Sequence, residues 1–139
     1  MALLGLNSAA KDLAALMDAD SNLNLTLATD LHVHVMPSSP DRVVTVYDAG
    51  GTSPTLHLDR DEAQKNPSVS VQVRGAKGQH EAAKQLASDI EDFLDGLTAT
   101  QGGARYILIR AEGGIQPLGR DDQNRMLLSV NFRTIRTVA

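Results

Sequence analysis

The sequence predicts an α+β fold: a mainly antiparallel sheet of about five strands with two helices packed on one of its faces. Segments in which apolar and polar residues alternate follow one another directly, and strands without intervening helices form antiparallel sheets. Two other segments repeat apolar residues every three or four positions, which indicates amphipathic helices. The chain has 139 residues, of which 42% are hydrophobic and 22% charged, enough for one domain with a hydrophobic core. We therefore expect residues 1–139 to form a single domain with the element order α-β-β-β-α-β-β.

The first third of the chain is expected to contain one helix and two strands. Asn7 or Ser8 can cap a short helix whose apolar stripe ends at Met17. Apolar and polar residues then alternate over residues 31–35, which predicts a half-buried strand. Residues 43–47 are β-branched or aromatic on both faces, which predicts a strand in the interior of the sheet.

The rest of the chain is expected to contain three strands and the second helix. Valines alternate with polar residues over 69–73, and residues 106–109 are apolar on both faces. Between these strands, residues 79–95 have one apolar and one charged face and are followed by a glycine, as at many helix ends. The last strand alternates between inward apolar and outward polar residues from Arg125 to Arg133, and this alternation changes at Ile135. Alternation places Arg74 on the solvent face of the first of these strands, and Arg125 and Arg133 on that of the last.

Two connections are long, polar and rich in glycine and proline. Residues 48–67 lack a periodic pattern for about twenty positions, and residues 113–119 form a second such segment. Long connections in compact domains are usually functional or disordered. We expect both segments to be loops that carry contacts.

Net charge is −4, which argues against nucleic acid as the main partner because phosphate binding requires a basic surface. The charge is uneven: residues 1–100 hold 7 basic and 14 acidic side chains, whereas residues 101–139 hold 6 and 3. Chance can produce such a split, but the split would also let copies of the chain meet head to tail. No apolar run approaches the roughly 18 residues of a membrane span, and no positive charge precedes the short apolar stretch 2–6, so neither a span nor a signal peptide is expected.

Side chains that could carry chemistry are few. The chain has no cysteine, which excludes disulfides, thiolate metal sites and cysteine nucleophiles. His32 and His34 lie two apart on a predicted strand, and His57 or Asp59 could add a third metal ligand. Two histidines without further spacing are not a specific metal motif, so the favoured interpretation is a polar strand face without metal.

Acidic and basic side chains alternate before the last strand, where Asp121-Asp122 lies between Arg120 and Arg125. An ion-paired turn is favoured there over general acid–base catalysis, which needs a pocket. No serine-nucleophile, phosphate-loop or zinc-protease motif occurs, so we expect neither enzymatic activity nor a cofactor.

Several of these segments, in their order along the chain, resemble the bacteriophage minor capsid proteins that act as tail-completion, or tail-terminator, proteins of long-tailed phages. The resemblance spans about residues 31–133, and His80 occupies a position that is often aromatic in the family. The segments that carry it are Met36-Pro37-Ser38-Ser39-Pro40-Asp41, Tyr47-Asp48-Ala49-Gly50-Gly51, Asn66 to Gly75, Gly119-Arg120-Asp121-Asp122 with Arg125, and Asn131-Phe132.

The resemblance implies a structural virion protein that forms a ring, usually hexameric, at the head-proximal end of the tail tube. Such a ring stops tube polymerisation and joins the tail to the head, so the implied partners are other copies of the chain, the tail tube protein and the head completion or connector protein. It would be assembled in the host cytoplasm, with no membrane and no specific nucleic acid partner, although DNA would pass through the lumen.

The subunit and partner interface is expected to combine acidic and basic patches. The candidate residues are Asp59, Asp61, Glu62, Arg74, Arg120, Asp121, Arg125 and Arg133. Three alternatives stay open: another head–tail connector or tail-tube component, a small ligand- or peptide-binding domain, and a histidine-dependent metalloenzyme.

Overall fold

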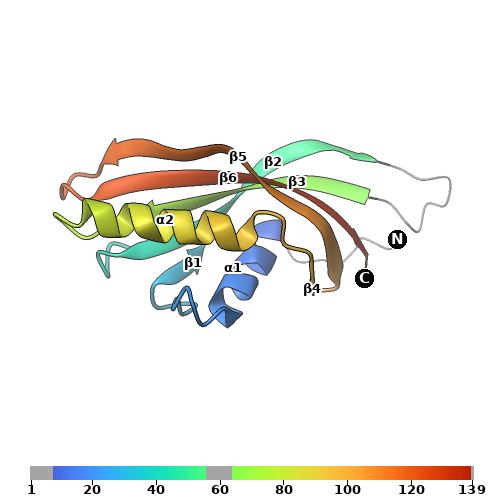
Figure 1. The fold of residues 1–139 in the computed structure, drawn as a ribbon, viewed down its shortest axis with the longest axis horizontal. Coiled ribbons are helices and arrows are strands. Elements are labelled where there is room, and N and C mark those ends of the chain that lie inside the picture. The colour runs from blue at the N-terminus through green and yellow to red at the C-terminus, as the bar shows by residue number, and fades with distance from the viewer. Residues whose placement is uncertain (1–7, 56–63, 139) are drawn as a thin grey trace.

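A six-stranded sheet forms the frame of the molecule. In the computed structural model, which describes residues 8–55 and 64–138, the strand order is β1-β2-β3-β6-β5-β4 (Figure 1). Strands β1 and β2 are parallel, and all other neighbouring pairs are antiparallel. The elements are α1 (Ala9–Ala19), β1 (Leu31–Val33), β2 (Val43–Thr55), β3 (Gln64–Arg74), α2 (His80–Leu94), β4 (Ala99–Gln101), β5 (Ala104–Arg120) and β6 (Met126–Val138).

Both helices pack on the same face of this sheet (Figure 1). Helix α1 lies against β1, β2, β3 and β4, whereas α2 lies against β3, β5 and β6. Alternate residues of the central strands meet them, because successive side chains of a strand point to opposite faces. The resulting core is aliphatic, with Phe132 and Tyr106 as its largest buried side chains. The predicted fold class is confirmed, with six strands in place of about five.

Helix boundaries follow the signals in the sequence. Ser8 caps α1, since its Oγ accepts a hydrogen bond from the Lys11 N–H at 3.2 Å. Helix α2 buries the apolar side of its predicted stripe: Ala83, Leu86, Ala87, Ile90 and Leu94. No helix in the described ranges is long and apolar enough to cross a membrane.

The described parts of the two segments expected to be loops are strand, and residues 56–63 of the first segment lie outside the described residues. β2 runs on to Thr55 and pairs with β3 in a long hairpin, with register shifts on either side of Gly51 and Thr52. At Gly51 φ is 134°, and an added Cβ would lie 2.2 Å from the Asn66 carbonyl oxygen, so only glycine fits there. The second segment, 113–119, belongs to β5 and carries register shifts of its own. Bulges interrupt the two-residue period that identifies a strand, and this explains why both segments read as loops.

Candidate interaction site

One end of the sheet carries a loop that two arginines hold in place. Arg74 lies on β3 and donates from Nε to the Asp41 carbonyl oxygen at 2.9 Å and from Nη2 to that of Pro40 at 2.6 Å. Arg125, just before β6, donates from Nη1 to the Ser38 carbonyl oxygen at 2.7 Å and to Asp41 Oδ1 at 3.1 Å. Both arginines were expected on solvent faces, yet they are only 3% and 4% exposed because this loop covers them. We call the contacts of Arg74 and Arg125 with residues 38–41 the arginine clamp.

The turn between β5 and β6 is tied to this clamp through Asp121. Its carboxylate accepts hydrogen bonds from the backbone N–H of Gln123 at 3.0 Å and of Arg125 at 2.8 Å, and from Arg125 Nε at 2.8 Å. Burial of Asp121 acts to raise its pKa, but these donors and the Arg125 charge outweigh it and hold the pKa below its ordinary value. The expected ion-paired turn is therefore present, and Arg120 Nη1 adds a bond to Asn124 Oδ1 at 3.2 Å.

The clamp brings like charges close together. Burial and the neighbouring Arg125 charge lower the pKa of Arg74, whereas the carboxylates of Asp121 and Asp41 act in the opposite direction. Burial likewise acts to lower the pKa of Arg125, but its bonds to Asp121 and Asp41 raise it above the ordinary value. Two buried guanidinium groups are thus balanced by two carboxylates, of which Asp41 reaches the surface.

The structure brings together only part of the predicted interface set. Arg74, Asp121 and Arg125 form one connected cluster, and Arg120 lies exposed beside it. Arg133 is also exposed but lies further along β6, opposite Ser68 and Arg110. The acidic members of the set, Asp59, Asp61 and Glu62, lie outside the described residues.

A second polar cluster, missed from the sequence, joins α1 to the far end of the sheet. Asp12 is 1% exposed, and its Oδ2 accepts from the Tyr106 hydroxyl at 2.5 Å and from Arg136 Nη1 at 3.5 Å. Arg136 Nη1 also donates to the Tyr106 oxygen at 3.1 Å. Burial, followed by the bond to Asp12, raises the pKa of Tyr106. No local pattern reveals this cluster, because Asp12 and Arg136 are 124 positions apart in sequence.

The two histidines considered as metal ligands contact different partners. His32 Nε2 lies 3.1 Å from the Thr29 carbonyl oxygen, and His34 Nε2 lies 3.2 Å from Asp48 Oδ2. His34 follows the strand with a φ of 66°, so the alternation that would align the two rings ends before it. Among the described residues no three potential ligands gather, and His57 and Asp59 lie outside them.

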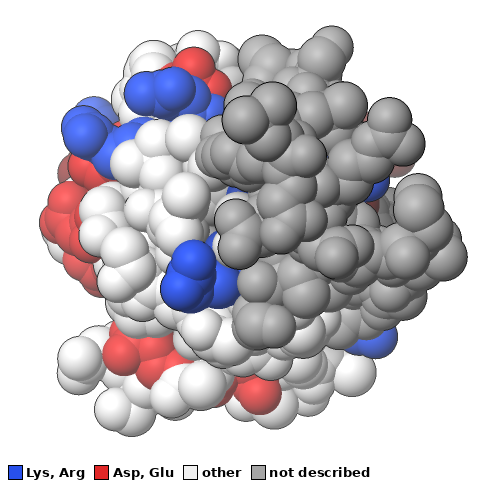
Figure 2. Space-filling model, turned by 90° about the vertical axis from the view of Figure 1, so that its right-hand side faces the viewer, with Lys and Arg blue, Asp and Glu red and all other residues white. Residues whose placement is uncertain are grey.

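Charged side chains are distributed unevenly over the surface. At the end of the molecule shown in Figure 2, blue basic groups occupy the upper and central parts, and red acidic groups follow the left and lower margins. In the two helices and their C-terminal caps, seven acidic side chains and two basic ones are at least partly exposed. They are Asp18, Asp20, Glu81, Asp89, Glu91, Asp92 and Asp95, against Lys11 and Lys84.

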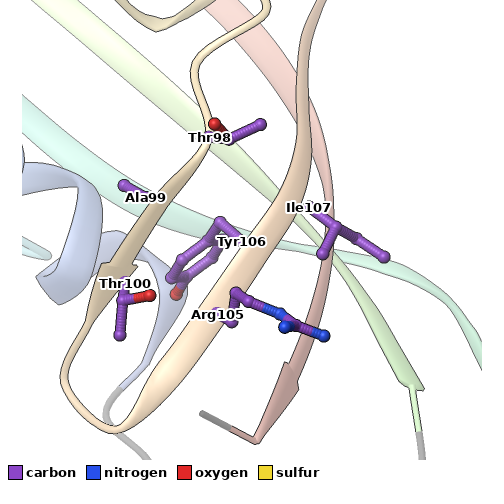
Figure 3. A pocket seen from close by; sticks show the side chains of 6 residues that line it. All are labelled: Thr98, Ala99, Thr100, Arg105, Tyr106 and Ile107. Atoms are coloured by element: carbon purple, nitrogen blue, oxygen red, sulfur yellow. The ribbon is translucent and has the colours of Figure 1, made fainter.

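The surface carries several hollows. The β4–β5 hairpin borders one of about 330 Å³, lined by Thr98, Ala99, Thr100, Arg105, Tyr106 and Ile107 (Figure 3). Tyr106 and Arg105 point to opposite sides of the strand, and the Tyr106 hydroxyl is engaged by Asp12. These six side chains include no nucleophile paired with a base.

Comparison with known proteins identifies a family and a shared fold. The family model described as "Bacteriophage tail terminator protein" matches residues 20–138. The chain also aligns with a chain of the structure titled "Virion of native gene transfer agent (GTA) particle", with a TM-score of 0.68 and 15% identity, over 95% of this chain and 96% of that one. A second solved chain aligns with a TM-score of 0.47 and 17% identity, over 93% of this chain and 89% of that chain. No curated protein matches the chain in sequence. Because the family model covers most of the sequence, the chain belongs to the bacteriophage tail terminator protein family.

Proposed function

We propose that the chain forms a closed ring, a hexamer, at the head-proximal end of a phage tail tube. The ring stops tube polymerisation and gives the head its joining surface. The observation that carries the proposal is the family match over residues 20–138. The likeness to a chain of a gene transfer agent particle supports the same fold. The role is structural, without a cofactor, and the partners are other copies of the chain, the tail tube protein and the head completion or connector protein.

The subunit contact that we propose is heterologous: one patch of each copy meets a different patch of its neighbour, and the rotation closes. The basic patch is the β5–β6 turn, together with the exposed Arg120 at the end of β5. Arg74, Asp121 and Arg125 bond within the chain, so we assign them to positioning this end of the molecule. The acidic patch is the segment with Asp59, Asp61 and Glu62, and opposite charges would set the register of the contact.

Assembly is proposed to take place in the host cytoplasm, and the finished ring to lie at the head–tail interface of the virion. Arg133 lies away from the β5–β6 turn, so we assign it to a different partner surface. The clamp fits this role because it holds residues 38–41 in one position beside the turn, and a rigid surface loses less conformational entropy on assembly.

Charge reversal at Arg120 tests the contact. Arg120→Glu reverses one exposed charge and removes a hydrogen bond to Asn124, so the monomer should fold as before. In a phage lacking the protein, this variant should fail to close the ring, and tails should be of uncontrolled length or fail to join heads. Electron microscopy gives tail length, and light scattering at two protein concentrations gives the mass of the assembly. Partial rescue by Asp61→Lys would locate the partner patch.

Lys11→Glu is the matched control, because Lys11 is an exposed basic residue of α1, which packs against β1, β2, β3 and β4. It should leave tail length unchanged. Normal tails with Arg120→Glu and with a deletion inside 52–60 would show that these patches do not form the ring. Normal virions from the phage without the protein would reject the tail-completion role, and tails absent altogether would favour a tube or connector component.

A further inference from the structure

The sheet face opposite the helices carries polar side chains at its centre. β3 turns Ser70 and Gln72 to this side, and β6 turns Ser129 and Asn131, which lie opposite them in register. Ser70 Oγ and Ser129 Oγ are 3.1 Å apart. Neither helix packs here, since both lie on the other side of the sheet (Figure 1). We call this side of the sheet the open face.

Three basic side chains lie beside this polar centre, on β5 and on the C-terminal half of β6. Arg110 on β5 pairs in register with Arg133 on β6, so the two guanidinium groups share the open face. Arg105 pairs with Thr137 and, by the same alternation, points to this side. All three arginines are exposed, and Glu112, opposite Asn131, is the acidic residue beside them.

Like charges directly opposite each other on a sheet are destabilising. Arg110 Nε donates to Asp95 Oδ1 at 2.9 Å, and the Ala111 N–H donates to the same oxygen at 3.0 Å. Arg133 has no ion pair within the described ranges. The helix layer on the other side of the molecule is acidic, with Asp89 and Asp92 among its exposed groups. The open face therefore has more arginines than acidic residues, although the net charge of the whole chain is negative.

We propose that the open face contacts the backbone of double-stranded DNA, with Arg105, Arg110 and Arg133 binding phosphates. The placement of this face toward the lumen of a ring rests on the proposed function. A protein interface of standard size has a buried core rich in aromatic and apolar side chains, whereas the centre of this face holds hydroxyl and amide groups. Such groups hydrogen-bond phosphate and sugar without reading sequence.

Three arginines per subunit suit a surface along which DNA slides rather than a site that holds DNA at one position. Phosphate contacts depend on salt and not on sequence, and they let a protein slide along DNA. Repetition around a ring multiplies the contacts while each subunit alone binds weakly.

Binding to duplex DNA can be measured by fluorescence anisotropy on the full chain. We expect affinity for a labelled duplex of about 30 base pairs to fall steeply between about 50 and 200 mM salt. The double variant Arg110→Ala/Arg133→Ala should bind more weakly, and the slope of log K against log salt should decrease by about 1.8, or roughly 0.9 for each lost phosphate contact. The matched control Lys11→Ala/Lys84→Ala removes two exposed basic groups from the helix layer and should bind like the unmodified chain.

Three results would overturn the proposal: no binding by the unmodified chain at low salt, an equal loss in the two double variants, or equal affinity for polyglutamate of matched charge. The last result would indicate an acidic protein as the partner.

Phage particles that carry Arg110→Ala/Arg133→Ala test the DNA contact separately from the proposed ring function. We expect tails of normal length joined to heads, with fewer DNA transfers per particle. Overlong tails would place the open face in a subunit contact and reject the DNA assignment while leaving the ring intact. Normal virions without the protein would reject the ring role but not the anisotropy result.

Discussion

The two faces of the sheet differ in what they bury, although the same strands form both. On β3, Val69, Val71 and Val73 meet the helices, whereas the residues between them, such as Ser70, face the other way. One alternation therefore places two sets of side chains on two faces: the apolar set packs against the helices, and the polar set lies on the open face.

Buried charges differ between the faces in the same way. On the helix side, Asp12, Tyr106 and Arg136 form a cluster that joins α1 to the sheet. On the open side, Arg74 and Arg125 bind a surface loop. The first cluster holds core elements together, and the second positions a surface, so their removal should have different consequences.

The largest effect is expected at Asp12. Asp12→Ala removes the buried carboxylate that contacts Arg136 Nη1 and accepts from the Tyr106 hydroxyl, and loss of one member of a buried ion pair typically costs about 3–5 kcal/mol. The free energy of unfolding from urea denaturation measures the loss. Tyr106→Phe removes one hydrogen bond and should cost only about 0.5–1.5 kcal/mol. If Asp12→Ala costs less than Tyr106→Phe, the cluster does not stabilise α1 as argued.

A comparable cavity effect is expected at Ile90, which is fully buried on α2. Ile90→Ala should cost about 2–5 kcal/mol in unfolding free energy, because the packed core cannot collapse fully into the space. Ser129→Ala, the matched change on the open face, should cost only about 0.5–1.5 kcal/mol, since it removes one hydroxyl contact. Equal losses of unfolding free energy at the two positions would contradict the argument that the helix-covered face stabilises the fold more than the open face does.

Local patterns predict the parts of the fold that depend on neighbours in sequence. Helix α2 lies within the predicted 79–95 because its apolar residues recur at the helical period. Asn7 or Ser8 was predicted to cap the first helix, and Ser8 is the cap. The short strand β4 was missed, because three residues are too few to show a period. β2 and β5 were cut short, because bulges near Gly51 and in 113–119 shift the period.

The candidate site was predicted by residue type but not by environment. Arg74 and Arg125 were chosen as charged groups on solvent faces, and both are buried. Their partners Ser38 and Asp41 come from a loop more than thirty positions away in sequence, which alternation along a strand cannot reveal. The same limit explains why Asp12 was missed.

The smallest expected effect lies in the turn between β5 and β6, and it depends on pH. The folded-state pKa of Asp121 lies below its unfolded value, so its ionised form stabilises the fold. This contribution is complete above the unfolded pKa of about 3.9 and is lost as pH falls through the lower folded value. Asp121→Asn should therefore lower the urea midpoint at pH 7, and its difference from the unmodified chain should shrink as pH falls below about 4.

Asp122→Asn is the control for this titration. Asp122 is the exposed neighbour, and its side chain accepts no hydrogen bond from the described residues. Its replacement should leave the urea midpoint unchanged at both pH values. A difference between Asp121→Asn and the unmodified chain that persists undiminished to pH 2 would mean that the turn is stabilised by the shape of the side chain and not by its charge. In that case the Asp121–Arg125 pair would not couple the turn electrostatically to the clamp, and protonation would leave the loop at residues 38–41 in place.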